Sequence, residues 1–521
     1  MHRHRLVVAL GMLVLGSGTT LSAQTFPGSD PVLQRVWQEG MENSHAYQLA
    51  QVLLDSIGPR LTGSPAHRAA NDWAVAMYQS WGIDARNEQY GTWRGWERGI
   101  SHIDLVEPRV RTLEGITLAW SPGTSGKVRG GVVILPQVAD SSEFAAWLPQ
   151  LRGKFVLTSF PQPTCRTDAN WEEYAVPASF EKMKAERDTA RTAWTGRMRN
   201  TGVNFRELRR RLEDAGALGI VTSRWSAGWG VNRMSSASTE KVPTLDLSCE
   251  DYGLVFRLAA NGQNPVLQVE AEARFLGEVP VFNTIAEMRG SERPDEYVVL
   301  SAHYDSWDGA SGATDNGTGS VTMMEAMRIL KTVYPNPKRT IVAGLWSGEE
   351  QGLNGSRAFV ADHPDIVEGL QALFNQDNGT GRVVNISMQG LTGAGAHFAR
   401  WLAQVPSEVT RHINLRIPGT PGRGGSDYAS FICAGVPSFS LFSLSWDDRY
   451  TWHTNRDTFD KVVLDDLKNN ATLTAMLAYL ASEDPERVPR DQRVMPVSQR
   501  TGEQLTWPQC RDGRRSWEER R

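Results

Sequence analysis

The stretch VVLSAHYDSWDGASGATDNGTGS, residues 298–320, joins an apolar run that ends at a histidine to a glycine-rich segment and an aspartate. The apolar run has the length and the β-branched composition of a buried strand, and the glycines predict a loop. The stretch therefore predicts a strand, a loop and a helix, with His303 at the end of the strand and Asp315 at the start of the helix.

The same alternation of expected strands and helices continues towards the C-terminus. Apolar segments such as TIVAGLWS, ALFNQD and SFSLFS alternate with helical patterns, the last of which is VLDDLKNNATLTAMLAYLA. Near-continuous apolar strands separated by helices are typical of a mostly parallel sheet with helices on both faces. We expect this α/β domain to span residues 276–482.

Three further regions complete the expected mature chain. Residues 24–111 open with two helical patterns and are interpreted as an N-terminal helical part of the same domain. Residues 112–275 carry short β-type runs such as GGVVILP and GKFVLTSF around a charged helical stretch, which predicts an inserted β-rich module. Residues 483–521 are polar and arginine-rich and predict a loosely ordered tail.

Residues 1–23 have the pattern of a secretory signal peptide, with basic residues, the apolar run LVVALGMLVLG and small residues before an expected cleavage after Ala23. No stretch reaches the roughly 20 apolar residues that a membrane span needs. We therefore expect an exported protein, periplasmic or extracellular, without a membrane span; a retained N-terminal anchor is the alternative. The formal net charge of −4 gives no reason to expect nucleic acid as a partner.

The four cysteines, Cys165, Cys249, Cys433 and Cys510, have no C-x-x-C spacing, which argues against a cysteine-based zinc cluster. We favour a disulfide between Cys165 and Cys249, because both fall in the expected inserted module. Cys433 follows an apolar helical pattern, and we expect it to be a buried thiol.

Imidazole and carboxylate side chains follow the expected strands of the α/β domain. Because ligands of such sheets bind at the carboxyl ends of the strands, we expect these side chains to meet at one edge. Histidine and carboxylate ligands without thiolate suit zinc or a similar divalent metal in an open catalytic site. The candidates are His303, Asp305, Asp315, Glu349, Glu350, Asp377 and His453.

The charges of the candidates favour two metals, since three carboxylates and a bridging hydroxide balance two divalent cations. Asp315 is the best-placed bridge, because it lies between the other candidates in the chain and at a helix start. The neighbours Glu349 and Glu350 diverge, so one can bind metal while the other acts as general base. Asp305 can hydrogen-bond the imidazole of His303 and fix its tautomer. A metal pair of this kind supports hydrolysis by a hydroxide nucleophile.

The segments SAHYDSW, GATDNGTG, LWSGEEQGLNGS, NQDNG and WHTNRDTFDKV resemble the metal-site segments of the co-catalytic zinc exopeptidases, which include bacterial leucyl aminopeptidases and plasma glutamate carboxypeptidase. The resemblance implies two zinc ions and a cis peptide bond after Asp315. It also identifies residues 112–275, through LRGKFVL and AGALGIV, as similar to a protease-associated domain. In the implied site His303 and Asp377 bind one zinc ion, Glu350 and His453 bind the other, Asp315 bridges them, and Glu349 is the general base.

These patterns predict a secreted metallo-exopeptidase that removes N-terminal residues from peptides or splits dipeptides. One alternative is a carboxypeptidase of the glutamate carboxypeptidase type, for which Arg423 and Arg449 are the candidate carboxylate-binding residues. The alternative from another class is a non-catalytic, metal-bearing binding protein. The absence of a G-x-S-x-G motif argues against a serine hydrolase.

Overall fold

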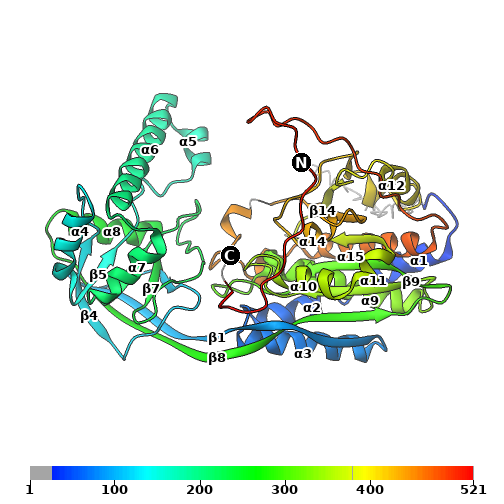
Figure 1. Ribbon diagram of the computed structural model, residues 1–521, viewed down its shortest axis with the longest axis horizontal. Coiled ribbons are helices and arrows are strands. Elements are labelled where there is room, and N and C mark those ends of the chain that lie inside the picture. The colour runs from blue at the N-terminus through cyan, green and yellow to red at the C-terminus, as the bar shows by residue number, and fades with distance from the viewer. Residues whose placement is uncertain (1–25, 378–379, 447, 520–521) are drawn as a thin grey trace, which may run out of the picture.

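Two lobes joined by two long strands make up the molecule (Figure 1). The computed structural model describes residues 26–377, 380–446 and 448–519, so the predicted signal peptide lies outside the described residues. Strands β1 (Asp84–Glu107) and β8 (Val266–Met288) pair antiparallel along most of their length and run from one lobe into the other. Both lobes therefore belong to one 14-stranded sheet.

Parallel strands form the centre of the large lobe, and the predicted α/β fold class is confirmed. The strand order is β14, β11, β9, β10, and β8 closes this group by pairing antiparallel with β10. All residues of β10 and β11 are buried, which explains why their sequences are apolar runs without alternation. The bounds are β9 Arg293–His303, β10 Arg339–Trp346, β11 Leu370–Asn375, β12 Val383–Ser387, β13 Asn414–Arg416 and β14 Ser438–Ser443.

Helices flank this sheet (Figure 1). The long helices α9 and α15 pack against each other and against β9, and their apolar side chains form much of the main core. Ser64 caps α3 by accepting the N–H of His67, and Pro65 occupies the first helical position. The bounds are α1 Pro31–Trp37, α2 Ala46–Gln51, α3 Pro65–Ser80, α9 Thr318–Val333, α10 Asn354–Asp362, α11 Pro364–Gly369, α12 Ala394–Leu402, α13 Ser407–Thr410, α14 Tyr428–Ile432 and α15 Leu464–Glu483.

The small lobe contains a second group of parallel strands, β4 to β7, with β3 antiparallel at its edge. It also carries helices, among them the 24-residue α6, which the short β-type runs of the sequence do not anticipate. The predicted disulfide between Cys165 and Cys249 is confirmed within this lobe. The bounds are β2 Arg111–Thr112, β3 Gly115–Thr117, β4 Val128–Ile134, β5 Lys154–Leu157, β6 Gly219–Thr222, β7 Thr244–Leu247, α4 Ser141–Trp147, α5 Asp168–Tyr174, α6 Pro177–Asn200, α7 Phe205–Asp214 and α8 Cys249–Ala260.

The C-terminal segment differs from the loosely ordered tail that its composition predicts. It runs over the large lobe and ends near the junction of the lobes (Figure 1). Cys433 forms a disulfide with Cys510 of this segment, so the prediction of a buried thiol was wrong. The ring of Trp517 packs edge-on against Trp93, with 5.4 Å between the ring centroids. A few residues of the tail therefore fix it to the large lobe, although the tail is polar on average and its composition does not indicate these contacts.

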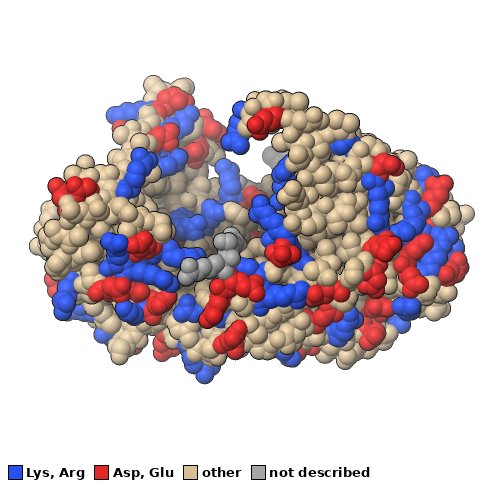
Figure 2. Space-filling model, in the orientation of Figure 1, with Lys and Arg blue, Asp and Glu red and all other residues tan. Residues whose placement is uncertain are grey.

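The surface mixes acidic and basic side chains, and a hollow lies between the two lobes (Figure 2). Lys and Arg side chains gather on the walls of this hollow in the same view. Among the described residues, the structure contains no helix of the length and apolar character that a membrane crossing requires.

Candidate metal centre

Parallel pairing brings the ends of three strands to one edge of the sheet. His303, the last residue of β9, lies opposite Trp346, the last residue of β10, and β11 runs parallel on the other side of β9. The loops that follow β10 and β11 therefore begin beside His303. This arrangement explains how candidates far apart in the sequence come together.

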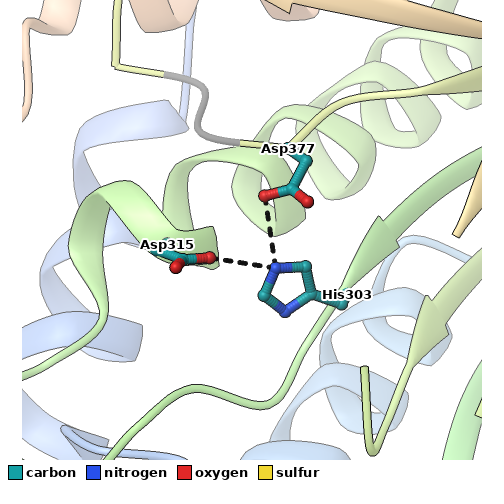
Figure 3. A group of neighbouring side chains, drawn as sticks. All are labelled: His303, Asp315 and Asp377. Atoms are coloured by element: carbon teal, nitrogen blue, oxygen red, sulfur yellow. Dashed lines mark hydrogen bonds and ion pairs between the residues drawn. The ribbon is translucent and has the colours of Figure 1, made fainter. Parts of the chain in front are cut away.

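The first group of candidates consists of His303, Asp315 and Asp377, which point towards one another (Figure 3). The side chain of His303 is 1% exposed, and its Nδ1 lies 2.9 Å from the backbone carbonyl of Asp305. Its Nε2 lies 3.1 Å from Oδ1 of Asp315 and 3.3 Å from Oδ1 of Asp377. The carbonyl of Asp305 favours the tautomer with a proton on Nδ1, which leaves Nε2 as a ligand atom.

The second group consists of Asp315, Glu350 and His453. Nε2 of His453 lies 3.1 Å from Oδ2 of Asp315 and 2.9 Å from Oε2 of Glu350. Asp315 thus belongs to both groups and directs one carboxylate oxygen to each histidine. Within each group the candidate ligand atoms lie within 4.8 Å of one another.

The loop that carries Asp315 is held by a second carboxylate. Asp457 accepts hydrogen bonds from the backbone N–H of Thr314, at 2.7 Å, and of Asp315, at 3.1 Å. The peptide bond between Asp315 and Asn316 is cis, as the resemblance implies, and Nδ2 of Asn316 donates to the carbonyl of Gln376. Asp457 was missed as a site residue, although it lies four residues after His453 within the segment WHTNRDTFDKV.

A buried arginine supports the glycine-rich part of the same loop. The guanidinium of Arg60 donates to the backbone carbonyls of Ser311, at 2.7 Å, and Gly312, at 3.0 Å. Gly312 has a φ of +61°, and a Cβ atom there would lie 2.3 Å from Cβ of Ser306, so this turn requires glycine. Arg60 stands in IGPRLTG, far from the motifs in sequence, and only the fold reveals its role.

The carboxylate of Asp305 orients the two glutamates. Its Oδ1 accepts the backbone N–H of Glu349 at 3.2 Å, and its Oδ2 accepts that of Glu350 at 3.3 Å. Thr62 donates a further hydrogen bond to Oδ2. The sequence suggests that this carboxylate bonds the imidazole of His303; instead the backbone carbonyl does so, and the carboxylate oxygen lies 3.8 Å from Nδ1. The close turn after β9 brings the carbonyl nearer to the ring than the side chain.

The small lobe contacts the segment that carries His453. The backbone of His453 has a φ of +58°, a left-handed conformation that costs a non-glycine residue on the order of 1 kcal/mol. The N–H of Met234 donates to the carbonyl of His453 at 2.6 Å, and the N–H of Asn232 donates to Oδ1 of Asn455 at 2.9 Å. The ring of Trp452 stacks on the imidazole at a centroid distance of 4.0 Å. These contacts hold the imidazole in place against the strained backbone.

Burial and neighbouring charges raise the pKa values of some groups in the site and lower that of another. Burial raises the pKa of Glu349 well above its ordinary value, and burial together with repulsion from Asp315 raises that of Glu350 to about 7. Burial alone would lower the pKa of His453, but Glu350 and Asp315 outweigh it and the pKa reaches about 9. Burial opposes ionisation of Asp315 too, yet the bonds from His303 and His453 bring its pKa below the ordinary value.

The donor set fits divalent cations. Oε1 of Glu350 is buried and makes no hydrogen bond, which is costly for a carboxylate oxygen that no cation neutralises. A cation would also displace the protons that the histidines otherwise hold, since ligation needs neutral imidazole and ionised carboxylate. Two such cations could lie one on each side of Asp315.

The large aromatic side chains that stand near the candidates in sequence are exposed to different extents. Trp446 and Trp452 are 57% and 40% exposed, whereas Tyr428 is 7% exposed and Trp307 lines the pocket that also contains Asp315 and Glu350. Of the arginines expected for carboxylate binding, Arg423 borders a different pocket between α14 and the tail and donates to the carbonyl of Thr506.

Comparison with known proteins finds similarity to peptidases. Residues 283–478 match the sequence profile of the family described as Peptidase family M28. Carboxypeptidase Q of Mus musculus is 27% identical over 458 residues, which cover 87% of this chain and 88% of the relative.

Two solved structures share the fold. A peptidase M28 precursor of Shewanella amazonensis has a TM-score of 0.63 at 24% identity, covering 88% of this chain and 97% of that chain. A zinc aminopeptidase from Bacillus subtilis has a TM-score of 0.54 at 19% identity, covering 86% of this chain and 97% of that chain. The similarity to both structures extends over most of this chain and is not confined to the segment that matches the family profile.

Proposed function

Because this chain belongs to peptidase family M28 and is a metallo-exopeptidase, we propose that it uses two zinc ions to remove N-terminal residues from peptides or to split dipeptides. The observation that carries this proposal is the position of Asp315, whose two carboxylate oxygens face the two histidines. A carboxylate shared between two sets of histidine and carboxylate is an arrangement that suits a pair of divalent ions.

We assign the ligands from these contacts. His303 and Asp377 would hold one zinc ion, Glu350 and His453 the other, and Asp315 would bridge them. When bound, the zinc ions would polarise the scissile carbonyl and lower the pKa of a water molecule beside them.

Glu349 is the proposed general base. It follows the same strand as Glu350 but is absent from both groups of close ligand atoms, so its carboxylate remains available for proton transfer. Burial raises its pKa, which favours a carboxylate that can take a proton from the attacking water and return it to the leaving amine. Asp305 acts indirectly, because its carboxylate orients the backbone of Glu349.

We also propose that the protein is exported and that residues 112–275 form a protease-associated domain. Two disulfides suit an oxidising compartment outside the cytosol. Determination of the N-terminal residue of the protein recovered from its producing cell tests the removal of a signal peptide: a start at Gln24 supports export with cleavage after Ala23, and an intact Met1 contradicts that cleavage.

A carboxypeptidase is the second candidate, because the similarity to carboxypeptidase Q covers most of both chains. A panel of short peptides with free or blocked termini separates the candidates. Cleavage that a blocked N-terminus abolishes supports the aminopeptidase. Cleavage that needs a free C-terminal carboxylate but tolerates a blocked N-terminus supports the carboxypeptidase. Zinc binding without cleavage of any peptide supports a binding protein.

A further inference from the structure

The end of the C-terminal tail lies against the loop that carries Glu349 and Glu350. The guanidinium of Arg514 donates to the backbone carbonyl of Gln351 at 2.9 Å, and its backbone N–H donates to Oδ1 of Asn354 at 3.1 Å. The approach is close, since a Cβ atom on Gly513 would lie 2.4 Å from the carbonyl oxygen of Asn354. The tail therefore contacts the loop one residue beyond a proposed zinc ligand.

Aromatic rings connect the tail to the other side of the same glutamate. The ring of Trp517 packs against Trp120, with 5.2 Å between centroids, and Trp120 packs edge-on against Trp307 at 6.1 Å. The indole nitrogen of Trp307 donates to Oε2 of Glu350 at 2.6 Å. Trp120 is fully buried, so it has little freedom to move independently of its neighbours.

Covalent and backbone contacts fix the tail in this position. The disulfide between Cys433 and Cys510 attaches it just beyond α14. The backbone N–H of Thr92, in β1, donates to the carbonyl of Arg515 at 2.7 Å, and the Arg515 side chain pairs with Asp362 at the end of α10. The segment from Cys510 to Trp517 is thus tied to the sheet, to a helix and to the loop of the two glutamates.

We propose that Arg514 and Trp517 are positioning residues for the metal centre. Arg514 holds the backbone of the glutamate loop through Gln351, which sets the direction of Glu349. Trp517 holds Trp307 through Trp120, which keeps the indole hydrogen bond on Glu350. Neither residue touches substrate or metal. The inference rests on the proposed function, because it assigns a task within the same site.

Arg514→Gln and Trp517→Ala test the proposal, with the exposed Arg511→Gln as the matched control on the same tail. Arg514→Gln should lower kcat about tenfold with little change in KM, because the base is misdirected while the substrate pocket is intact. Trp517→Ala should weaken zinc binding about tenfold in a chelator competition, and Trp517→Phe should restore most of it. Arg511→Gln should leave kcat and zinc affinity unchanged, because this exposed side chain takes no part in the contacts that hold the tail on the glutamate loop.

A double-mutant comparison tests whether Trp517 acts on Glu350 through Trp120 and Trp307. In a Trp307→Phe background the hydrogen bond to Glu350 is absent, so Trp517→Ala should have no further effect on zinc affinity. A full additional loss would overturn the path through Trp307. Unchanged kcat and zinc affinity in both tail variants would overturn the whole inference. If the wild type cleaves no peptide but Trp517→Ala still weakens zinc binding, the proposed function fails while the role of Trp517 stands.

Discussion

The indole nitrogen of Trp307 donates a 2.6 Å hydrogen bond to Oε2 of Glu350. The same oxygen lies 2.9 Å from Nε2 of His453, so the indole bond and the proposed zinc ligation share one carboxylate. A hydrogen bond to a ligating carboxylate fixes its direction before the metal arrives. Trp307 is therefore expected to support metal binding more than substrate contact.

Replacement of Trp307 by phenylalanine should weaken zinc binding by about 10- to 100-fold, because the aromatic packing remains while the hydrogen bond to Glu350 is lost. Equilibrium competition with a chelator of known affinity measures the change. Trp452→Phe is a suitable comparison, because its ring stacks on His453 but has no hydrogen bond to a proposed ligand carboxylate. Equal zinc affinities for wild type and Trp307→Phe would contradict this role.

Glu349→Gln and Asp315→Asn should separate catalysis from metal binding. Glu349→Gln should keep both zinc ions and lose about 100- to 10,000-fold in kcat, since an amide cannot accept the proton of the attacking water. Asp315→Asn should lose metal, because an amide oxygen cannot neutralise two cations. Elemental analysis of the purified variants measures their zinc content, and peptide hydrolysis measures their kcat. A fully active Glu349→Gln enzyme would remove this residue from the mechanism.

The apparent affinity for zinc should rise with pH. The neighbouring Glu350 and Asp315 outweigh the effect of burial and raise the pKa of His453 to about 9, so zinc must displace a proton from its imidazole at neutral pH. Each displaced proton changes the apparent affinity about tenfold per pH unit below that pKa. Chelator competition at several pH values between about 6 and 8 should show that the apparent zinc affinity rises by at least about one logarithmic unit per pH unit. A flat dependence would show that no proton is displaced.

His67 should make the fold sensitive to acid. This buried residue of α3 lies 2.9 Å from Oγ of Ser347, and burial, with some repulsion from Arg60, lowers its pKa to about 3. Between the ordinary pKa near 6.5 and about 3, the unfolded chain binds a proton that the folded chain excludes. Its contribution to stability is therefore complete above the ordinary pKa and is lost as the pH falls towards 3.

Lowering the pH from about 7.5 to 5 should cost the wild type about 2 kcal/mol through this histidine alone. His67→Gln removes the titrating group, so its unfolding free energy should fall by about 2 kcal/mol less over the same interval. Urea unfolding of both proteins in the presence of a chelator measures the difference. Identical losses in the two proteins would show that His67 does not titrate as its burial implies.

The sequence predicts the large lobe because the buried parallel strands are apolar throughout and end at polar side chains. It does not predict β1, whose residues such as Arg94, Trp96 and Glu97 mix charged and aromatic side chains without alternation. This strand is stabilised by pairing with β8 over a long distance, a tertiary effect that local pattern does not record. The tail is missed for a similar reason, since Cys510 and Trp517 find their partners far away in the chain.

The candidate ligands stand in short motifs after each strand, so the sequence predicts them. The sequence does not indicate which residues hold them. Arg60 acts through a guanidinium that bonds backbone carbonyls, and Asp457 acts through a carboxylate that bonds backbone N–H groups. Contacts to the backbone leave no pattern of residue types in the partner segment, so only the folded chain reveals them.

A zinc titration of the chelated protein followed by peptide hydrolysis tests the proposed metal pair most directly. We expect no cleavage without metal and a rise in activity that reaches its plateau at two zinc ions per chain, with Glu349→Gln binding the same amount while remaining inactive. Full activity without metal, or a plateau at one zinc ion per chain, would contradict a site in which Asp315 bridges a metal pair.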